Sequence, residues 1–535
     1  MSNDPAEPRP GDADRASAGS IGRGQWLVWL YAAVALLVIP IFPHMPSANE
    51  FSRWALAAAM VERGSLEISP EIALLGDRII DVATVHGRLH SDKAPGGSFL
   101  GVPAYALART FVGPPDANNL RETVTLMRLA ISTLPVLLLC LGLVRQAKSV
   151  GIAPDRIAFG LGAMLFGTPL FAYGLLLYSH AMTAAALFGS WLLLFGSDRS
   201  QPSLRELAAG GLLGLAAISE YPATVPAAVI AICALRRRGV VGGLRMAAGA
   251  LPPLVALAVY NHAAFGSVFS LSLGFERAAQ FRQLHSSFMF GMRLPSPWIA
   301  ARLLFDPGKG LLLFSPVLVL ALVAIPAAWR RLERPAFWAL VLGPLSLLLV
   351  YAGFANWDGG WSVGARYLVA AVPFLTYLLL LGRPRLIDPV LLGASVVAIA
   401  LTSLVFPFVP PGYAFPWASF AVPLLAKGLV APNLLHYLSR SLAITIPFVL
   451  VTVALVLAVG HRRALYAAMG VVAWTLVAFL CVATWFPEGN GSRWYVESSY
   501  FERLDVRTAS PAVINPWTLR QMQMDRMLPP SSWPF

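Results

Sequence analysis

The amino-acid sequence predicts an all-α protein that is embedded in a membrane. Of its 535 residues, 57% are hydrophobic and only 13% are charged, and the mean hydropathy is +0.66. A water-soluble domain of this length does not carry such a composition. The chain also repeats apolar runs of the length, roughly 17 to 25 residues, that a helix needs to cross a bilayer, and in lipid only helices satisfy their own backbone polar groups in such runs.

About thirteen such runs follow one another along the chain. They cover residues 25–42, 122–144, 157–173, 178–195, 206–218, 222–235, 243–265, 311–328, 337–354, 364–381, 389–408, 441–459 and 464–486. The runs at 206–218 and 222–235 are short, so these two could also form one broken pair.

The basic residues of the short loops predict how the bundle is oriented. If the chain alternates between the two sides of the membrane, all of these basic loops fall on one side. They contain Arg145, Lys148, Arg156, Arg199, Arg205, Arg236, Arg237, Arg238, Arg330, Arg331, Arg334, Arg383, Arg385, Arg462 and Arg463. Because such loops stay in the cytoplasm, we expect a cytoplasmic N-terminus and an extracytoplasmic C-terminus.

The composition also predicts the domain organisation. Residues 1–24 are rich in small and polar residues, as in a disordered cytoplasmic tail. We expect the transmembrane domain at 25–486 and a small, irregular extracytoplasmic cap at 487–535. The first outer loop, at 44–121, is the longest polar connection of the chain, so we expect the chemistry of the protein there.

Charge and cysteine usage exclude two other classes of function. The net charge is +13, but the basic residues are dispersed over membrane loops and do not form one soluble face, so nucleic acid is not an expected partner. Cys140, Cys233 and Cys481 each lie in an apolar run. The sequence therefore predicts neither a disulfide framework nor a cysteine metal site.

Residues 50–63 of the first outer loop have the pattern of an amphipathic helix. Apolar residues recur there every three to four positions, which predicts a helix that lies in the headgroup layer. Glu50 and Arg53 share its polar face. They could form a surface ion pair that contributes only about a few tenths of a kcal/mol. The position of Glu50, where the first apolar run ends, favours a carboxylate held at the mouth of the bundle.

A second polar stretch of this loop predicts an anion site. Asp81 precedes a turn-like His86-Gly87-Arg88, and the stretch from Ser91 to Gly97 opens an apolar helix at 98–111. A glycine-rich entry into a helix presents free N–H groups at the positive end of the helix dipole, and Lys93 adds a full charge. A phosphate group suits such a site. The alternative is a capped helix start with a solvated lysine.

These motifs, in this order, resemble a known family. In the first outer loop they are Glu50-Phe51-Ser52-Arg53, Asp81 and Lys93-Ala94-Pro95-Gly96. Further along they are Gly167-Thr168-Pro169, Tyr178-Ser179-His180, Glu220-Tyr221-Pro222, Tyr260-Asn261, Phe265-Gly266-Ser267, Lys309-Gly310-Leu311-Leu312, Ser315-Pro316, Trp357-Asp358-Gly359-Gly360-Trp361 and Gly364-Ala365-Arg366-Tyr367. The chain resembles, over residues 25–380, the bacterial polyprenyl-phosphate-dependent glycosyltransferases of the GT-C superfamily, which are related to protein O-mannosyltransferases and lipid A aminoarabinose transferases.

The resemblance implies a GT-C-like bundle with juxtamembrane helices in the first outer loop, located in a bacterial inner membrane. It implies a polyprenyl-phosphate sugar donor and an acceptor hydroxyl on a glycolipid, a polysaccharide or a protein. A carboxylate would act as general base while cations hold the departing phosphate. The mannosyltransferases carry an Asp-Glu pair after the first span, whereas this chain has Asn49-Glu50. The role of base therefore falls on Asp81 or Glu50.

The same resemblance suggests further site residues. Lys93, Arg366 and Arg53 are the candidate ligands of the donor phosphate, Lys as a point charge and Arg as a fork. The candidate substrate-binding residues are Asp92, His180, Glu220, Tyr221, Trp357, Asp358 and Trp361. The two tryptophans could instead belong to an interfacial aromatic belt, and His180 could be a hydrogen-bonded helix-end histidine. No metal site is predicted, although Asp81, Asp92, His86 and His90 leave a divalent cation open.

Three other classes of protein compete with this interpretation. A transporter or flippase would show inverted repeats and ionisable residues near the bilayer midplane, and the sequence has neither. An O-antigen ligase or polymerase uses diphosphate carriers and has its large loop late in the chain, whereas here it comes first. A non-catalytic assembly partner would tolerate the loss of Asp81 and Lys93.

Overall fold

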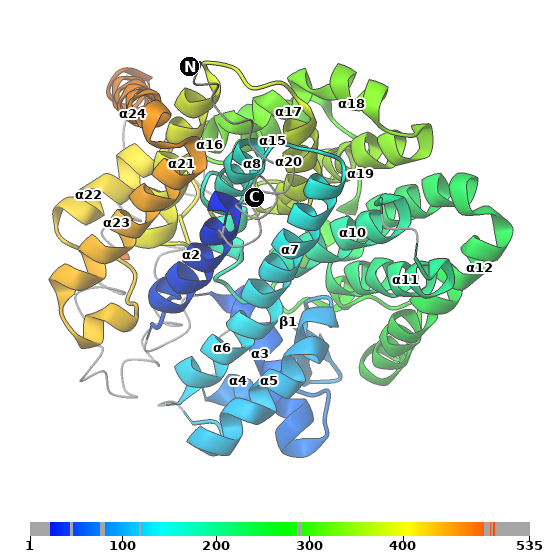
Figure 1. The fold of residues 1–535 in the computed structure, drawn as a ribbon. Coiled ribbons are helices and arrows are strands. Elements are labelled where there is room, and N and C mark those ends of the chain that lie inside the picture. Colours follow the sequence, from blue (N-terminus) through cyan, green and yellow to red (C-terminus); the bar gives the residue numbers. More distant parts are fainter. Residues whose placement is uncertain are drawn as a thin grey trace, which may run out of the picture.

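The computed structural model describes residues 22–42, 47–74, 81–116, 119–197, 200–285 and 291–485, together with 493, 496 and 497. The described part is a bundle of helices with one small β-hairpin (Figure 1). The predicted tail at 1–24 and the predicted cap at 487–535 lie almost entirely outside the described residues.

The N-terminal half begins with α2 (Arg23–Val38), α3 (Ala48–Arg63), α4 (Ser69–Ala73), β1 (Val82–Val85), β2 (Arg88–Ser91), α5 (Gly96–Val112) and α6 (Leu120–Arg128). It continues with α7 (Leu134–Ser149), α8 (Pro154–Phe166), α9 (Leu170–Tyr173), α10 (His180–Phe195), α11 (Pro202–Ser219) and α12 (Thr224–Phe265). In Figure 1, α3 to α6 and the hairpin gather at the lower end of the molecule.

The C-terminal half begins with α13 (Ala279–His285), α15 (Pro297–Phe305), α16 (Leu311–Phe314), α17 (Val319–Val323), α18 (Ile325–Arg331) and α19 (Arg334–Ala352). It ends with α20 (Val372–Leu381), α21 (Asp388–Val405), α22 (Val422–Ala426), α23 (Arg440–Val459) and α24 (Ala464–Trp485). A 3₁₀ segment, η5 (Arg366–Ala371), leads into α20. In Figure 1, α17 and α18 lie at the upper end of the bundle, away from α3 to α5.

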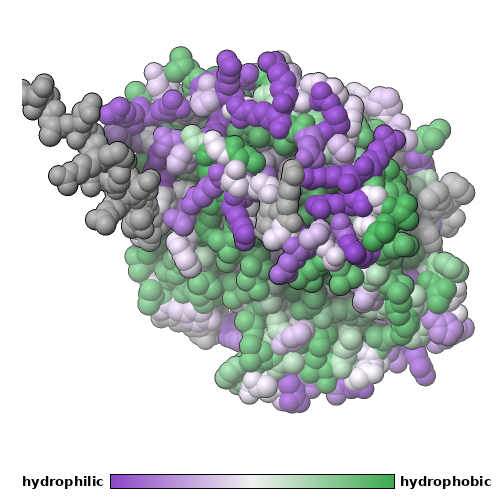
Figure 2. All heavy atoms as spheres, turned by 45° about the vertical axis from the view of Figure 1, so that its right-hand side comes forward, coloured by the Kyte–Doolittle hydropathy of each residue, from purple (hydrophilic) through white to green (hydrophobic). Residues whose placement is uncertain are grey.

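Within the described residues, six helical stretches are long and apolar enough to cross a membrane, and four shorter helices are also apolar. The predicted number of about thirteen spans is therefore not confirmed, although the mostly helical, apolar character is. Figure 2 shows a broad hydrophobic surface beneath a crowded band of hydrophilic side chains, the pattern that a bilayer requires.

Proline and glycine explain where the predicted spans and the observed helices differ. The predicted run at 311–328 is divided into α16, α17 and α18, with Pro316 and Pro326 at the breaks. Proline has no N–H to continue a helical ladder, so a hydropathy pattern alone does not detect such breaks. In α12 the break comes at Gly239, whose φ of 68° lies in the left-handed region that glycine tolerates.

The first outer loop is where one expectation was wrong. The helix predicted at 50–63 is present as α3, but it does not lie at the surface, because every residue from Glu50 to Ala59 is buried. It packs against α5 and the strand β2. Its polar face is therefore covered by protein rather than by headgroups, which places the side chains of Ser52 and Arg53 inside the fold.

The β-hairpin of the loop was predicted only as a turn. β1 and β2 pair antiparallel in a register that joins Val82 to Ser91 and Val85 to Arg88. The two residues between the strands, His86 and Gly87, have φ values of 48° and 79°, as in the tight turns that suit twisted hairpins. This register brings the residue before β1 next to the residues after β2.

Candidate functional site

The hairpin register forms the first part of the site. Asp81 precedes β1, and Asp92 and Lys93 follow β2, so the three side chains meet at the open end of the hairpin. The ammonium of Lys93 lies 2.6 Å from Oδ2 of Asp92 and 3.2 Å from Oδ2 of Asp81. Asp92 also accepts a hydrogen bond of 3.0 Å from Ser52. Of the two carboxylates, Asp81 is the accessible one, at 20% side-chain exposure against 3%.

The two glycines after Lys93 hold this turn against neighbouring helices. A Cβ on Gly96 would lie 2.4 Å from Ser219 Oγ and 2.9 Å from the carbonyl oxygen of Ile218. A Cβ on Gly97 would lie 2.8 Å from Ser179 Oγ. The start of α5 therefore packs on the C-terminal end of α11 and the N-terminal end of α10. These glycines therefore allow the helices to pack closely. The sequence suggested a different role for them, which is to present free N–H groups.

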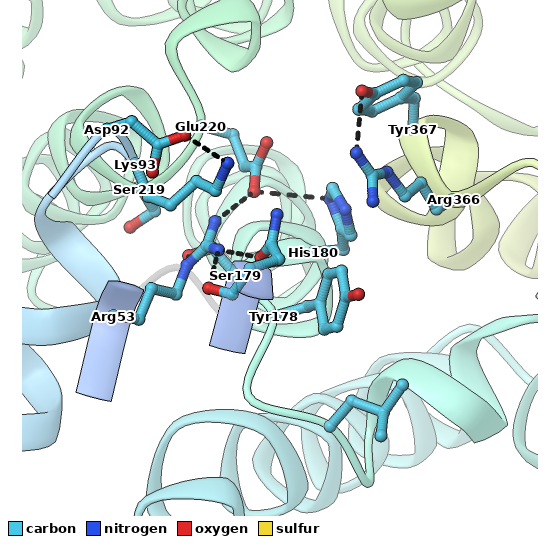
Figure 3. A network of polar contacts seen from close by, with 12 residues as sticks. Arg53, Asp92, Lys93, Tyr178, Ser179, His180, Ser219, Glu220, Arg366 and Tyr367 are labelled. Atoms are coloured by element: carbon cyan, nitrogen blue, oxygen red, sulfur yellow. Dashed lines mark hydrogen bonds and ion pairs between the residues drawn. The ribbon is translucent and has the colours of Figure 1, made fainter. Parts of the chain in front are cut away.

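Arg53 connects α3 to both of these helices. Its guanidinium donates to Ser179 Oγ at 3.1 Å and to the side chain of Asn49, and it lies 3.4 Å from Oε1 of Glu220. The same oxygen of Glu220 lies 3.4 Å from Nδ1 of His180. Figure 3 shows Arg53 of α3 and His180 of α10 meeting at Glu220. Tyr221 follows directly, in the 3₁₀ turn that leads into α12.

Arg366 faces this cluster from η5 (Figure 3). Its guanidinium carbon lies 5.8 Å from the centre of the Tyr178 ring, and that ring stacks on His180 at 5.8 Å. Nη2 of Arg366 donates to the hydroxyl of Tyr367 at 3.0 Å. Its Nε is buried and has no acceptor within the described part of the chain. Arg366 therefore presents an unsatisfied donor beside the cluster, which an oxyanion would satisfy.

A glycine makes room for Arg366. Gly359 has a φ of 73°, and a Cβ there would lie 2.7 Å from Nε of Arg366. The next residue, Gly360, also has a positive φ, of 62°, but its Cβ would meet nothing within 4 Å. The carbonyl oxygen of Gly360 accepts a hydrogen bond of 2.6 Å from Nζ of Lys309. The buried lysine thus fixes the loop that carries the arginine.

Burial and neighbouring charges of both signs shift the pKa values of the residues in this cluster. Burial raises the pKa of Glu220, while the cations Arg53, Arg366 and Lys93 oppose that rise. Burial also raises the pKa of Asp92, against the pull of Lys93. Burial alone would lower the pKa of Lys93, but Asp81 and Asp92 outweigh it and raise this pKa. The positive charges of Arg53, Arg366 and Lys93 therefore all act on the carboxylate of Glu220.

Glu50 forms an ion pair of its own, with Arg128. Its side chain is fully buried, and Oε2 lies 2.6 Å from Nη2 of Arg128. Oε1 accepts from Nε of Arg128 at 2.9 Å and from the backbone N–H of Leu177 at 2.6 Å. Arg128 also donates to the carbonyl oxygen of Pro40. Both oxygens of Glu50 are thus engaged in a buried ion pair that joins α3 to α6. No local pattern indicates this partner, which lies 78 residues further along the chain.

The predicted aromatic residue Trp357 and the metal candidate His90 make their contacts outside the charge cluster. One face of Trp357 is covered by Arg302, whose guanidinium carbon lies 4.4 Å from the ring centre. Asp358 is buried, and Trp361 is partly exposed in the same loop. His90 pairs with the carbonyl oxygen of Leu66 at 3.2 Å, and no group of three His, Cys, Asp or Glu side chains within the described residues has the arrangement of a metal site.

Among solved structures, the chain is similar in fold to glycosyltransferases. One is ArnT from Cupriavidus metallidurans bound to undecaprenyl phosphate, with 16% identity, a TM-score of 0.48, and coverage of 92% of this chain and 84% of that one.

Two further structures belong to the same comparison. The arabinosyltransferase EmbB from Mycobacterium smegmatis has 11% identity and a TM-score of 0.40, over 92% of this chain and 44% of that one. The oligosaccharyltransferase from Archaeoglobus fulgidus has 12% identity and a TM-score of 0.37, over 88% and 59%. No family model and no curated protein sequence matches the chain.

Proposed function

We propose that this chain is a membrane glycosyltransferase that moves a sugar from a polyprenyl phosphate to an acceptor hydroxyl on the extracytoplasmic face. The observation that carries the proposal is the meeting of Lys93, Arg53 and Arg366 around Glu220, with the partly exposed carboxylate of Asp81 at the edge of the cluster. Three cations from three parts of the chain suit a phosphate group, and a carboxylate beside them suits a hydroxyl.

In the proposed reaction Asp81 is the general base. Its carboxylate takes the proton of the acceptor hydroxyl while that oxygen forms a bond to the anomeric carbon. The bond between the anomeric carbon and the phosphate oxygen breaks, and the polyprenyl phosphate leaves with the electron pair. General-base help of this kind contributes about 10² to 10⁴ in rate. Glu50 is a weaker candidate, because both of its oxygens are held by Arg128 and Leu177.

The cations bind and stabilise the donor phosphate. Arg366 has a buried Nε that is free to donate, and Lys93 supplies a point charge next to the start of α5. Arg53 holds Glu220 and adds positive potential to the same region. Charge that develops on the departing phosphate is stabilised by donors that are already in place, which is the largest single contribution in many enzymes.

The test uses the full-length protein, purified in detergent, and a radiolabelled polyprenyl-phosphate sugar as donor. We expect sugar transfer to a bacterial membrane extract, with release of polyprenyl phosphate. Asp81→Asn should reduce the rate by about 10² or more while donor binding remains. Asp116→Asn, which changes an exposed carboxylate of the same loop, is the control and should leave the rate unchanged. Full activity of Asp81→Asn would remove Asp81 from the role of base.

A further inference from the structure

A second charged feature lies at the opposite end of the molecule from the proposed donor site. It is a partly open hollow of about 360 Å³. Five arginines line it, namely Arg156, Arg330, Arg331, Arg383 and Arg385. They come from α8, α18 and the segment after α20. In Figure 1, α17, α18 and α20 lie in the upper part of the bundle, whereas α3 to α5 lie at the bottom.

Arg156 lies at the bottom of this hollow and is held in place by hydrogen bonds. It is 7% exposed, and it donates to Oδ2 of Asp388 at 2.6 Å and to the carbonyl oxygen of Leu379 at 2.7 Å. Its Nε is buried without an acceptor in the described residues, and Oδ1 of Asp388 is buried there without a donor. The buried ion pair keeps this guanidinium in place. The unsatisfied Nε is a donor that a ligand in the hollow could use.

The other four arginines carry uncompensated charge. Arg330, Arg331, Arg383 and Arg385 are exposed, and none of them makes an ion pair with a described residue. No acidic side chain is among the described residues that line the hollow. Four forked cations around one concave surface that no carboxylate lines form a site for a phosphate oxyanion. The buried carboxylate of Asp388 is paired with Arg156.

The surroundings of the hollow favour a lipid over a free anion. Val323 and Leu320 of α17 contribute apolar lining. Leu322 is 50% exposed beside them, and Leu386 and Ile387 are 80% and 47% exposed just beyond the arginines. Apolar side chains at the outer surface of a helix bundle lie against acyl chains. A charged hollow bordered by an apolar surface therefore matches a headgroup with its tails.

We propose that this hollow binds the phosphate headgroup of an anionic phospholipid, with the acyl chains against α17 and the segment after α20. By the distribution of basic loops, the lipid belongs to the cytoplasmic leaflet, where anionic headgroups attract Lys and Arg. The site is separate from the donor site, and the proposal does not depend on the enzymatic function.

The test measures lipid binding by the purified full-length protein in a neutral detergent. The probes are dioctanoyl phosphatidylglycerol, dioctanoyl phosphatidylcholine and inorganic phosphate, titrated in separate arms. We expect phosphatidylglycerol to bind at least ~10-fold more tightly than phosphatidylcholine and than inorganic phosphate, because each basic side chain at the membrane surface adds to the attraction.

Two double variants address the arginines that can be removed without leaving a buried charge unpaired. R330Q/R331Q and R383Q/R385Q should each weaken phosphatidylglycerol binding by ~10-fold or more. The control is K148Q/R236Q, which removes two exposed cations from loops predicted on the same side. Arg156 is left intact because its loss would leave the buried carboxylate of Asp388 without its ion-pair partner.

The outcomes separate the proposal from its alternatives. Selective loss of phosphatidylglycerol binding in the two arginine variants, with the control unchanged, supports it. Equal weakening in K148Q/R236Q would show general surface attraction and overturn it, as would wild-type affinity in both arginine variants. If inorganic phosphate bound as tightly as phosphatidylglycerol, the ligand of the hollow would be a soluble anion and not a lipid, which would overturn the proposal. Melting temperatures measured alongside verify that each variant is folded.

Discussion

The guanidinium of Arg53 lies 3.4 Å from the carboxylate of Glu220, across 167 positions of sequence. This contact joins the first outer loop to the point where α11 ends and α12 begins. Both side chains are largely buried, at 4% and 13% exposure. Burial lowers the pKa of Arg53, and the negative charge of Glu220 acts in the opposite direction. Each group thus opposes the shift that burial imposes on the pKa of the other.

Replacing Glu220 should therefore destabilise the protein. Glu220→Gln leaves Arg53 buried without an anionic partner, and breaking a buried pair from one side costs about 3 kcal/mol or more. We expect a lower melting temperature in detergent. The control is Glu122→Gln, because Glu122 pairs with Arg121 at 39% side-chain exposure, where an ion pair contributes about 0–1 kcal/mol. Equal melting temperatures for the two variants would contradict the structural role of Glu220.

Gly359 and Gly360 allow a matched test of the role of Arg366. Alanine at either position adopts an unfavourable positive φ, which costs about 1–2 kcal/mol. Only the Cβ at residue 359 would reach Arg366, at 2.7 Å from Nε. We expect Gly359→Ala to raise the donor KM by about tenfold or more, the equivalent of one lost charge-assisted hydrogen bond. Gly360→Ala should keep a donor KM close to that of the wild type.

The packing of α5 can be tested in the same way. A Cβ at Gly96 would meet the backbone oxygen of Ile218 at 2.9 Å, and the backbone of α11 cannot move aside without shifting the site. A Cβ at Gly101 would come closest to the terminal methyl of Met127, at 2.5 Å, and this flexible side chain can change rotamer. We expect Gly96→Ala to lose both melting temperature and activity, and Gly101→Ala to keep most of both.

Parts of the fold follow directly from the sequence, because hydrophobic length and periodicity determine them. The runs at 441–459 and 464–486 correspond to α23 and α24 within one residue at each end. Asp81 and Lys93, both selected as candidate site residues from the sequence, lie 3.2 Å apart. The hairpin that brings them together was not predicted, since the turn His86-Gly87 was the only sign of it.

Other features depend on partners that no local pattern reveals. The periodicity of α3 indicates an apolar face, but it does not indicate that α5 and β2 cover the opposite face as well. The pairing of Glu50 with Arg128 is a tertiary contact between residues in separate helices. Hydropathy treats Pro316 and Pro326 as neutral members of a run, although their missing N–H groups break the helix.

The two carboxylates that the sequence left open as base are expected to behave differently. Glu50→Gln should lower the melting temperature by breaking a fully buried ion pair, while the turnover of the protein that remains folded stays within a few-fold of wild type. Asp81→Asn should keep the melting temperature and lose turnover. Measuring both quantities on both variants assigns the base. A stable, inactive Glu50→Gln variant would transfer the role to Glu50.

Lys309 makes a pH-dependent contribution to stability. Its side chain is buried, and burial lowers its pKa from 10.5 to about 7, against the pull of Asp358. Between these two pH values the unfolded chain holds a proton that the folded chain has released. The unfolded state then binds more protons, so the free energy of unfolding rises with pH. Below about pH 7 the lysine is protonated in both states and the full cost of burying its charge remains.

The measurement is the melting temperature of wild type and Lys309→Met from pH 6 to pH 10. The variant loses the hydrogen bonds to the carbonyl oxygens of Gly360 and Ser362, so its melting temperature at a single pH is not informative. The slope of its melting temperature against pH is the informative quantity. We expect wild type to gain stability relative to the variant as the pH rises above about 7. Lys148→Met, at an exposed lysine, should retain the wild-type slope. A constant difference between wild type and Lys309→Met across this range would mean that Lys309 titrates alike in the folded and unfolded chain, and that the loop carrying Arg366 rests on a lysine that stays charged.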